Sequence, residues 1–504
     1  MAARKSVVLV TVDCLRADHC GFMGYRRRTT PFLDQLAAES FVFPTAIVAG
    51  VPTYYSLPTI LASRYPLAFG RELLGLAVGE EDLASALRTV GYATAFFGAA
   101  NPYLSARFGY DFGFDTFQDF LDSSPTSISD PVPALTSEIG WAQRLNRTLD
   151  NISHRLGPLG ASYDELYFQY CQRLAAPAPG SLDSLRRFPA VDVIVDQAAA
   201  WLPSVGESPF FLWLHLMDPH SPYYPAEKGQ ELLGERKTTA ARARYVNACW
   251  NRSDLQPRRL RRYRNEVMSL YDSAVCWVDA QIARLIEVIR RNGLWENCIF
   301  VLTADHGEEF LEHDGRYHAP SSLAEELIHV PLLLRVPEVE GREVSKAPFS
   351  LLHLAPTLLD AAELPIPGEF KGQSHWTEIH KGRTWSEPAI AECISGCTNP
   401  FRPELRRGRR ILAVRETRHK LVLNFETSTE HLFDLEADPA EQMPLPNHAG
   451  TSERRHLLEA AFEHLREPRQ RVSEGYLRTR LRDIELNLAN AVRHARPGVV
   501  GPAR

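Results

Sequence analysis

The chain has 504 residues, enough to bury a large core and to divide into two or more structural units. Hydrophobic residues make up 44% and charged residues 23%, which is typical of a soluble globular enzyme. The formal net charge of −6 argues against nucleic acid as a partner.

The N-terminus looks like a secretory signal only superficially. Its apolar run, Val7 to Val12, is too short, Asp13 interrupts it, and no small-residue cleavage site follows. No stretch approaches the roughly 18 apolar residues of a membrane span. The eight cysteines are scattered without CxxC spacing, which favours buried free thiols. We therefore expect a buried first strand, no integral membrane segment and a cytoplasmic location.

Short apolar runs alternate with amphipathic stretches along most of the chain. The predicted buried strands span residues 6–13, 93–101, 209–218, 297–305 and 330–337. The predicted helices span residues 29–40, 80–91 and 271–293. This alternation predicts an α/β fold, a mainly parallel sheet flanked by helices.

The pattern changes toward the C-terminus, where residues 409–442 read as short antiparallel strands. We predict a catalytic α/β domain at 1–375, in which the Pro- and Ser-rich stretch 121–187 is a variable insertion over the site. A small antiparallel sheet subdomain is expected at 376–450, followed by a helical, Arg-rich tail at 451–504.

Polar side chains end three of the predicted strands. The first strand ends in Asp13, the third in Asp218 and His220, and the fourth in Asp305 and His306. A single Asp after a strand is usually a cap or turn residue. Because ligands bind at the carboxyl ends of strands in such sheets, three such ends together indicate one polar site.

The residue types at these strand ends suit a divalent cation. Asp13, Asp305 and His306 are ligands for a hard or borderline ion. His313 and His318 follow within twelve residues of His306 and add further imidazoles.

Two other histidines, His215 and His329, precede or enter buried strands, so we interpret them as core residues. The stretch "RRRTT" (Arg26 to Thr30) is interpreted as a solvated turn before the first helix rather than an anion patch.

Five segments, in this order, resemble the sulfatase family of the alkaline phosphatase superfamily. They are "VLVTVDCLRADHCGFMGYRRRTTPFLDQLAAES", "FFLWLHLMDPHSPYYP", "LTADHGEEFLEHDGRYHAPSSLAEELIHVPLLLRVP", "HLAPTLLDAAELPIP" and "HLFDLEADPAEQ". The resemblance implies an alkaline-phosphatase-like fold and a metal bound by Asp13, Asp305, His306 and a nucleophile at the start of a helix.

Counting back from "SRYP", the resemblance places that nucleophile at Thr53. Sulfatases carry there a Cys or Ser in the motif Cys/Ser-x-Pro/Ala-x-Arg, which is oxidised to formylglycine. This chain reads Thr53-Tyr54-Tyr55-Ser56-Leu57, so we expect no formylglycine.

Other positions also depart from the sulfatase pattern. Cys14 stands where many sulfatases have a second Asp, and Asn101 where many have a Lys against the sulfate. The pattern Thr53-x-x-Ser56-Leu57-Pro58 instead resembles the phosphoethanolamine transferases of the same superfamily, which use a threonine nucleophile. Those enzymes carry a membrane-spanning N-terminal region.

A threonine can serve as nucleophile when a metal stabilises its alkoxide. The start of a helix also favours an incoming anion through its N–H groups and dipole. The simpler interpretation of Thr53 is a helix N-cap, and Ser56 is an alternative nucleophile.

We therefore predict a metal-dependent ester hydrolase or transferase acting through a covalent Thr53 intermediate, with a phosphodiester or phosphate ester favoured. The alternatives are a sulfatase without formylglycine and an anion-binding homologue without turnover. The predicted cofactor is one divalent ion (Ca, Mg, Mn or Zn), and the predicted partner is a small-molecule or glycan- or lipid-type ester. The candidate residues are Thr53, His220 and His318 for catalysis, Asn101 and His313 for substrate, and Asp13, Thr53, Asp305 and His306 for the metal.

Overall fold

The computed structural model describes residues 4–70, 73–121, 165–166, 168–169, 180–234 and 237–466. Most of the predicted insertion at 121–187, and the tail beyond residue 466, lie outside the described residues. Within the described ranges, no helix is both long enough and apolar enough to cross a lipid bilayer.

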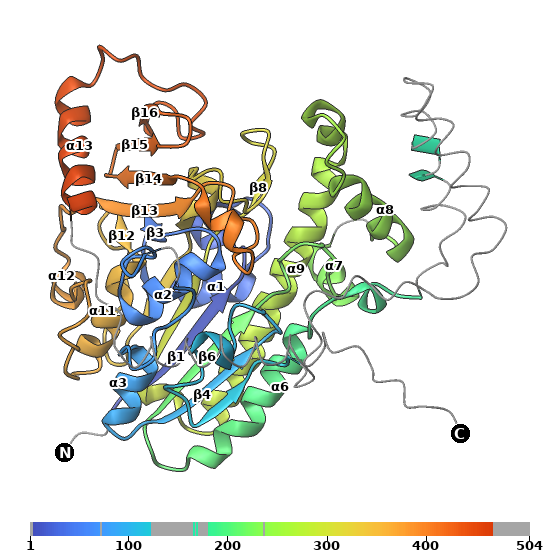
Figure 1. Ribbon diagram of the computed structural model, residues 1–504. Coiled ribbons are helices and arrows are strands. Elements are labelled where there is room, and N and C mark those ends of the chain that lie inside the picture. The colour runs from blue at the N-terminus through green and yellow to red at the C-terminus, as the bar shows by residue number, and fades with distance from the viewer. Residues whose placement is uncertain are drawn as a thin grey trace, which may run out of the picture.

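A seven-stranded sheet forms the centre of the molecule (Figure 1). Its strands, in order across the sheet, are β2 (Phe41–Val42), β11 (Leu332–Arg335), β7 (Cys298–Ala304), β1 (Ser6–Val12), β6 (Phe210–Leu216), β4 (Ala93–Gly98) and β5 (Thr116–Gln118). All neighbours from β7 to β5 run parallel, whereas β11 is antiparallel to both β7 and β2. The predicted fold class, a mainly parallel sheet with flanking helices, is confirmed.

Helices cover both faces of this sheet. α1, α6 and α9 pack together on one face, while α2, α3 and α11 lie on the other (Figure 1). The α-helices are α1 (Pro31–Ala37), α2 (Thr53–Ala62), α3 (Leu83–Thr89), α6 (Val191–Trp201), α7 (Glu227–Leu233), α8 (Ala240–Trp250), α9 (Pro257–Arg291), α10 (Glu325–Ile328), α11 (Leu354–Ala361), α12 (Trp376–Lys381) and α13 (Thr451–Arg466). The 3-10 helices are η1 (Ala17–His19), η2 (Gly21–Met23), η3 (Ala106–Phe108), η5 (Asp183–Leu185), η6 (Leu202–Val205), η7 (Trp295–Asn297), η8 (Leu351–His353) and η9 (Pro403–Arg407).

The five predicted strands are all present, each trimmed at its ends. Every residue of β1, β6 and β7 is buried, because continuous apolar runs suit strands that are covered on both faces. The long helix α9, in contrast, begins at Pro257 rather than at the predicted Tyr271. Its first half buries Leu260 and Val267 at helical spacing, a signal that its many arginines obscured.

The register of the central strands places the predicted strand ends together. In the two ladders of β1, Val12 pairs with Ala304 of β7 and with Leu216 of β6. Asp13, the next residue, therefore lies beside Asp305, and its N–H donates to the Leu216 carbonyl (2.8 Å). The site is built on the edge where the three innermost strands end.

A separate four-stranded antiparallel sheet follows, in the order β13 (Ala389–Ile394), β14 (Arg410–Arg415), β15 (His419–Asn424) and β16 (Thr429–Asp434). α13 packs along it through Leu457 and Ala461, which contact a small core of Leu412, Val414 and Leu421. This sheet joins the main body where Glu392 N–H donates to the Ala49 carbonyl (3.0 Å). The predicted small C-terminal antiparallel sheet is thus confirmed.

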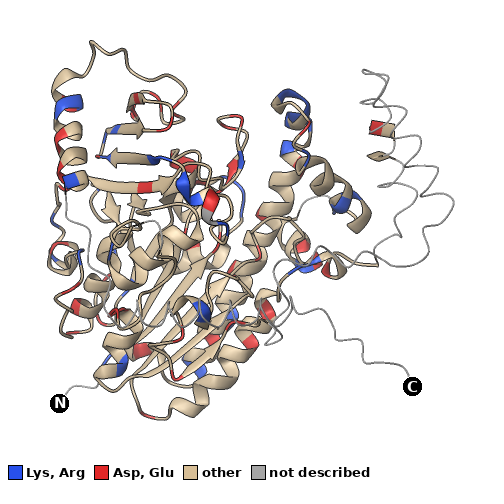
Figure 2. Ribbon diagram, viewed as in Figure 1, with Lys and Arg blue, Asp and Glu red and all other residues tan. Residues whose placement is uncertain are grey.

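Two smaller sheets complete the fold. The first has the order β10 (His329–Val330), β3 (Ala46–Ile47) and β12 (Phe349–Ser350), and the second is the hairpin β8 (Glu309–Phe310) and β9 (Arg316–Tyr317). Basic residues gather on α8 and on the first half of α9 (Figure 2). Arg261 pairs with Asp314 at 2.7 Å, and Arg264 with Glu312 at 3.1 Å, so this half of α9 holds the hairpin tip.

A buried ion cluster fastens the C-terminal sheet to α10. Lys420 Nζ has no exposed surface and lies 3.2 Å from Glu325 Oε1 and 2.8 Å from Glu441 Oε1. Arg415 Nε lies 3.3 Å from the same Glu325 oxygen. Burial would raise the pKa of Glu325, but Lys420 and Arg415 lower it to about 2.

We expect Lys420→Met to lower the free energy of unfolding at pH 7 by about 3–5 kcal/mol, because it removes the cation shared by two buried carboxylates and leaves only Arg415 beside Glu325. In the wild type the Glu325 contribution is complete above the unfolded pKa of about 4.3 and is lost as the pH falls toward 2. The deficit of the variant should therefore shrink as acid neutralises both carboxylates.

Denaturant unfolding at pH 7 and pH 4 measures this difference. The matched control is Lys237→Met, which breaks an exposed pair with Glu231 and should leave the midpoint unchanged. Equal midpoints for wild type and Lys420→Met at pH 7 would contradict the prediction.

Candidate functional site

The two carboxylates and the imidazole predicted as metal ligands form one buried cluster. His306 Nε2 lies 3.5 Å from Asp305 Oδ2 and 3.8 Å from Asp13 Oδ1, and none of the three side chains has exposed surface. The backbone N–H groups of His306 (3.0 Å) and Cys14 (3.4 Å) both donate to Asp305 Oδ1. These bonds fix the Asp305 carboxylate so that Oδ2 faces the imidazole.

The hydrogen bonds around the cluster leave acceptor atoms facing one another. His306 Nδ1 donates to the Gly307 carbonyl (2.8 Å), so in the neutral ring Nε2 carries a lone pair. Asp305 Oδ2 is buried and has no hydrogen-bond partner among the described residues. Buried acceptors in this arrangement require positive charge between them, so the cluster fits a divalent cation.

Thr53 enters the same cluster from α2. Its Oγ1 lies 3.1 Å from His306 Nε2, and the residue is 3% exposed. Pro52, not Thr53, occupies the N-cap position, and its carbonyl accepts from the N–H groups of Tyr55 (2.7 Å) and Ser56 (3.2 Å). Thr53 is therefore the first residue of α2, and its hydroxyl points to the metal-ligand cluster rather than capping the helix.

Ser56, the alternative nucleophile, lies one turn further into α2. It is fully buried, and its Oγ donates to the Thr53 carbonyl (3.3 Å). This contact inside the helix leaves Thr53 as the hydroxyl that reaches His306.

Two neighbours orient Asp13. Asn101 Nδ2 donates to Asp13 Oδ2 (3.2 Å), and Asn101 Oδ1 accepts from the Tyr103 N–H (3.0 Å). His215 Nε2 lies 3.3 Å from the same Asp13 oxygen, and its Nδ1 lies 2.9 Å from Thr11 Oγ1. His215 is buried as predicted, but it also supports a site residue. Its place on β6 opposite Thr11, one residue before Val12, is the pattern that points to this role.

These contacts set the protonation of Asp13. Burial alone would raise its pKa, but the charge of His220, the hydrogen bond with His215 and the charge of His306 hold the pKa well below its usual range. Asp13 therefore stays a carboxylate, the form that binds cations.

Two further imidazoles lie beside the cluster. The His318 ring centroid lies 4.4 Å from that of His306 and 5.0 Å from that of His220. His220 Nδ1 donates to the Ser221 carbonyl (2.5 Å), which leaves its Nε2 for a ligand. His318 Nδ1 lies 3.3 Å from Glu308 Oε1.

A cavity of about 440 Å³ opens over Thr53. Its wall is largely aromatic and apolar, and its polar groups converge where Thr53 lies. The lining residues are Pro52, Thr53, Tyr54, Asn101, Pro102, Tyr103, Met217, His220, Arg316, Tyr317, His318, Ala319, Pro320 and Thr398. A cavity of this size with few convergent polar groups is typical of a small-molecule site.

His313 does not line this cavity, and its predicted contact with substrate is not supported. The residue lies at the tip of the β8–β9 hairpin, and its Nε2 contacts Glu326 Oε1 (3.2 Å). That hydrogen bond raises the pKa of His313. His313 instead lines a different cavity, of about 230 Å³, together with residues of the C-terminal sheet. The hairpin turn separates His313 from His318, which follows β9 and lines the same cavity as Thr53.

Asp218, which ends a predicted strand, also does not line the cavity over Thr53. It pairs with Arg186, although it lies only two residues before His220. Burial raises the pKa of Asp218 to about 6, against the lowering effect of Arg186.

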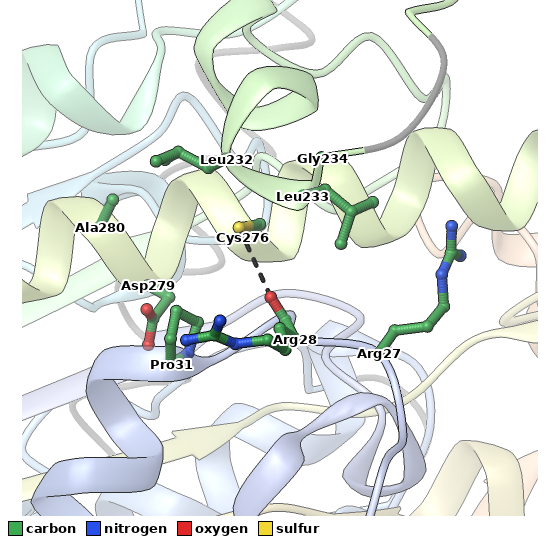
Figure 3. Close-up of a pocket in the computed structure, with 9 residues that line it drawn as sticks. All are labelled: Arg27, Arg28, Pro31, Leu232, Leu233, Gly234, Cys276, Asp279 and Ala280. Carbon is green, nitrogen blue, oxygen red and sulfur yellow. Dashed lines mark hydrogen bonds between the residues drawn. The ribbon is translucent and has the colours of Figure 1, made fainter.

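A larger cavity, of about 560 Å³, lies away from this chemistry between α7, α9 and the loop before α1 (Figure 3). Arg28 extends toward Asp279, and Arg27 extends the other way, to pair with Asp272 (Figure 3). Asp279 accepts from the N–H groups at the start of α1, so its carboxylate caps that helix. None of the candidate catalytic or metal residues lines this cavity.

Comparison with known proteins decides the family. The model of the sulfatase family matches residues 5–364, which is more than half of the chain. The chain belongs to the sulfatase family. A second model, described as N-sulphoglucosamine sulphohydrolase, C-terminal, matches residues 313–468. The resemblance seen in the sequence is thus confirmed, and the chain is a sulfatase-family hydrolase.

Relatives and solved structures extend over most of the chain. An arylsulfatase of Clostridium perfringens is 23% identical over 484 residues, 90% of this chain and 92% of that protein. A phosphonate monoester hydrolase of Agrobacterium radiobacter matches with a TM-score of 0.61 at 18% identity, over 93% of this chain and 96% of that one. A protein solved with its substrate D-glucosamine-2-N,6-O-disulfate matches with a TM-score of 0.63 at 16% identity, over 93% and 99%. At these identities the two structural matches show the fold alone.

We expect the purified chain to bind one equivalent of a divalent ion, and Asp305→Ala to weaken that binding by more than about 100-fold. Indirect partners of metal ligands alone are worth roughly 10–100-fold, and Asp305 is predicted to be a direct one. Metal analysis after dialysis against a weak chelator measures the effect.

Asp218→Asn is the matched control, because it also alters a buried strand-end carboxylate but one paired with Arg186. Retention of the ion by Asp305→Ala, or its loss from Asp218→Asn, would contradict the assignment.

Proposed function

We propose that this protein is a metal-dependent phosphoester hydrolase or transferase in which Thr53 is the nucleophile. The observation that carries the proposal is the 3.1 Å approach of Thr53 Oγ1 to His306 Nε2 at the floor of a cavity. Burying a hydroxyl beside two carboxylates and an imidazole costs free energy unless each polar group has a partner, so the arrangement indicates a functional role for Thr53.

The proposed reaction uses the start of α2 to meet the substrate. Thr53 Oγ1 attacks phosphorus, the ester oxygen leaves, and a phospho-Thr53 forms. Water or an acceptor alcohol then attacks the same phosphorus and releases the threonine. The first turn of α2 points its N–H groups and positive dipole end toward the anionic group.

A divalent ion held by Asp13, Asp305 and His306, with Thr53, would supply positive charge that stabilises the threonine alkoxide and the phosphoryl oxygens. The residues around it hold these groups in place. Asn101 and His215 orient Asp13, and the Gly307 carbonyl fixes the tautomer of His306.

His220 and His318 are the candidates for proton transfer to the leaving oxygen. Both line the cavity, and the centroids of their rings lie 5.0 Å apart. The ring of Tyr103 and the Tyr317 side chain line the same cavity and offer apolar surface to the body of an ester substrate. A small-molecule, glycan or lipid-type ester fits this wall.

The identity of residue 53 favours phosphorus over sulfur. Oxidation of a threonine side chain gives a ketone, whereas formylglycine is an aldehyde that only Cys or Ser can form. Thr53 can therefore act only as an alcohol. The same fold occurs in a phosphonate monoester hydrolase, so a phosphorus ester is compatible with the fold.

A sulfate ester is the second candidate, and the relatives favour it. The arylsulfatase of Clostridium perfringens aligns over 90% of this chain. Thr53 would then attack a sulfate ester without the aldehyde chemistry.

We expect Thr53→Ala to reduce turnover of a nitrophenyl phosphodiester or phosphate monoester by at least about 10³-fold, because a nucleophile is lost. Thr53→Ser should keep measurable activity, since it retains the hydroxyl. Rates on nitrophenyl phosphate, phosphodiester, phosphonate and sulfate esters test both points, and acid-quenched protein should carry a phosphoryl group on Thr53.

Ser56→Ala is the matched control in the same helix and should retain the activity. A sulfate rate above all the phosphorus-ester rates would transfer the assignment to the second candidate. Full activity in Thr53→Ala would exclude the threonine mechanism.

We expect His318→Ala to slow an alkyl phosphoester by about 10²–10⁴-fold and a nitrophenyl ester far less, because nitrophenolate leaves without a proton. The ratio of the two rates is the measurement, and His220→Ala is compared in parallel. Equal losses on both esters would mean that the histidine positions the substrate instead.

A further inference from the structure

Cys14 lies inside the proposed metal site. It follows Asp13 directly and is fully buried. Its backbone has φ of 62°, a left-handed conformation that side chains with a Cβ adopt at a cost in free energy. This conformation accompanies a thiol that lies among the metal-ligand atoms.

The position of Sγ is that of a ligand rather than of a core thiol. Sγ lies 3.0 Å from Asp13 Oδ1 and 3.4 Å from His318 Nδ1. Cys14 forms groups of potential ligand atoms both with His306 and His318 and with Asp13 and His220. The thiol therefore lies next to Asp13, His306 and the two neighbouring imidazoles.

Two of the three distances between the donor atoms match the edges of one small coordination sphere, and the thiol lies closer to Asp13 than such an edge. The separations from Asp13 Oδ1 to Cys14 Sγ (3.0 Å) and to His306 Nε2 (3.8 Å), and from His306 Nε2 to Asp305 Oδ2 (3.5 Å), define its edges. Ligands at the ordinary zinc distances of about 2.0–2.3 Å in a tetrahedron are about 3.3–3.8 Å apart.

A second observation also indicates a cation there. Asp305 Oδ2 and Glu308 Oε2 are buried carboxylate oxygens without a hydrogen-bond partner in the part of the chain that the structure describes. Neither Asp305 nor Glu308 has exposed surface.

We propose that Cys14 is a thiolate ligand of the metal ion, so that the site selects Zn²⁺ over Ca²⁺ and Mg²⁺. The inference rests on the metal-dependent function proposed above and specifies the class of ion. A donor set of two carboxylates, one imidazole and one thiolate, with Thr53 Oγ1 as a fifth donor during the reaction, suits zinc, whereas calcium and magnesium prefer oxygen ligands. On binding, the thiol proton is released to solvent and a sulfur–metal bond forms, without any change of oxidation state.

Cobalt substitution tests the ligand directly, because a thiolate bound to Co²⁺ gives a charge-transfer absorption in the near ultraviolet. We expect this band when the metal-free protein is titrated with Co²⁺, with an end point at one equivalent. Cys14→Ser should abolish the band, and Cys20→Ser, which alters another buried cysteine close in sequence, should leave it intact.

Cys14→Asp tests selectivity and guards against a folding defect, because Asp tolerates the left-handed backbone better than most residues. Calorimetric competition between Zn²⁺ and Ca²⁺ measures the ratio of their affinities. We expect this ratio to fall by more than about 100-fold, because loss of an indirect partner of a metal ligand alone costs roughly 10–100-fold. Both variants should keep the circular dichroism spectrum of the wild type.

Bound Co²⁺ without the thiolate band in the wild type would overturn the inference, as would an unchanged preference in Cys14→Asp. If the protein hydrolyses phosphoesters but its Co²⁺ form shows no thiolate band, only the thiolate ligand is refuted. If the protein prefers Zn²⁺ and its Co²⁺ form shows the band, but no esterase activity is found, the proposed function is refuted and the thiolate ligand is supported.

Discussion

The structure depends on two carboxylates, Asp13 and Asp305, that lie without solvent at the centre of the sheet edge. Ionised groups cost several kcal/mol each when they are buried without compensation. The register of β1 with β7 enforces their proximity, since Val12 pairs with Ala304 one residue earlier. The nearby imidazoles, the Asn101 amide and the first turn of α2 all offset or use this concentration of negative charge.

Much of this arrangement could be predicted from sequence because long apolar runs mark covered parallel strands, and such strands end at a common edge. Two predicted site residues lie away from the cavity, and the direction of each side chain depends on a partner elsewhere in the chain. The side chain of Asp218 pairs with Arg186, and that of His313 contacts Glu326. His318, only five residues after His313, lines the cavity. No local pattern distinguishes these choices, because each partner comes from a different element.

The chain combines the sulfatase-family frame with two side chains that depart from the family's usual pattern. The sulfatase-family frame is retained from β1 to α11, yet the side chain that starts α2 is an alcohol and the residue after Asp13 is a thiol. Tyr271 of α9 steadies this second departure, since its hydroxyl donates to the Cys14 carbonyl (2.7 Å) and accepts from the Arg16 N–H (3.0 Å). Function is therefore set by the site rather than by the frame.

The β8–β9 hairpin links three otherwise distant parts of the molecule. Its tip is held by arginines of α9, His313 beside it faces Glu326 and Glu441, and the strand that returns from it delivers His318 to the cavity. Because His318 follows β9 directly, the position of this candidate residue depends on the same hairpin whose tip contacts α9 and whose His313 faces Glu441 of the C-terminal segment.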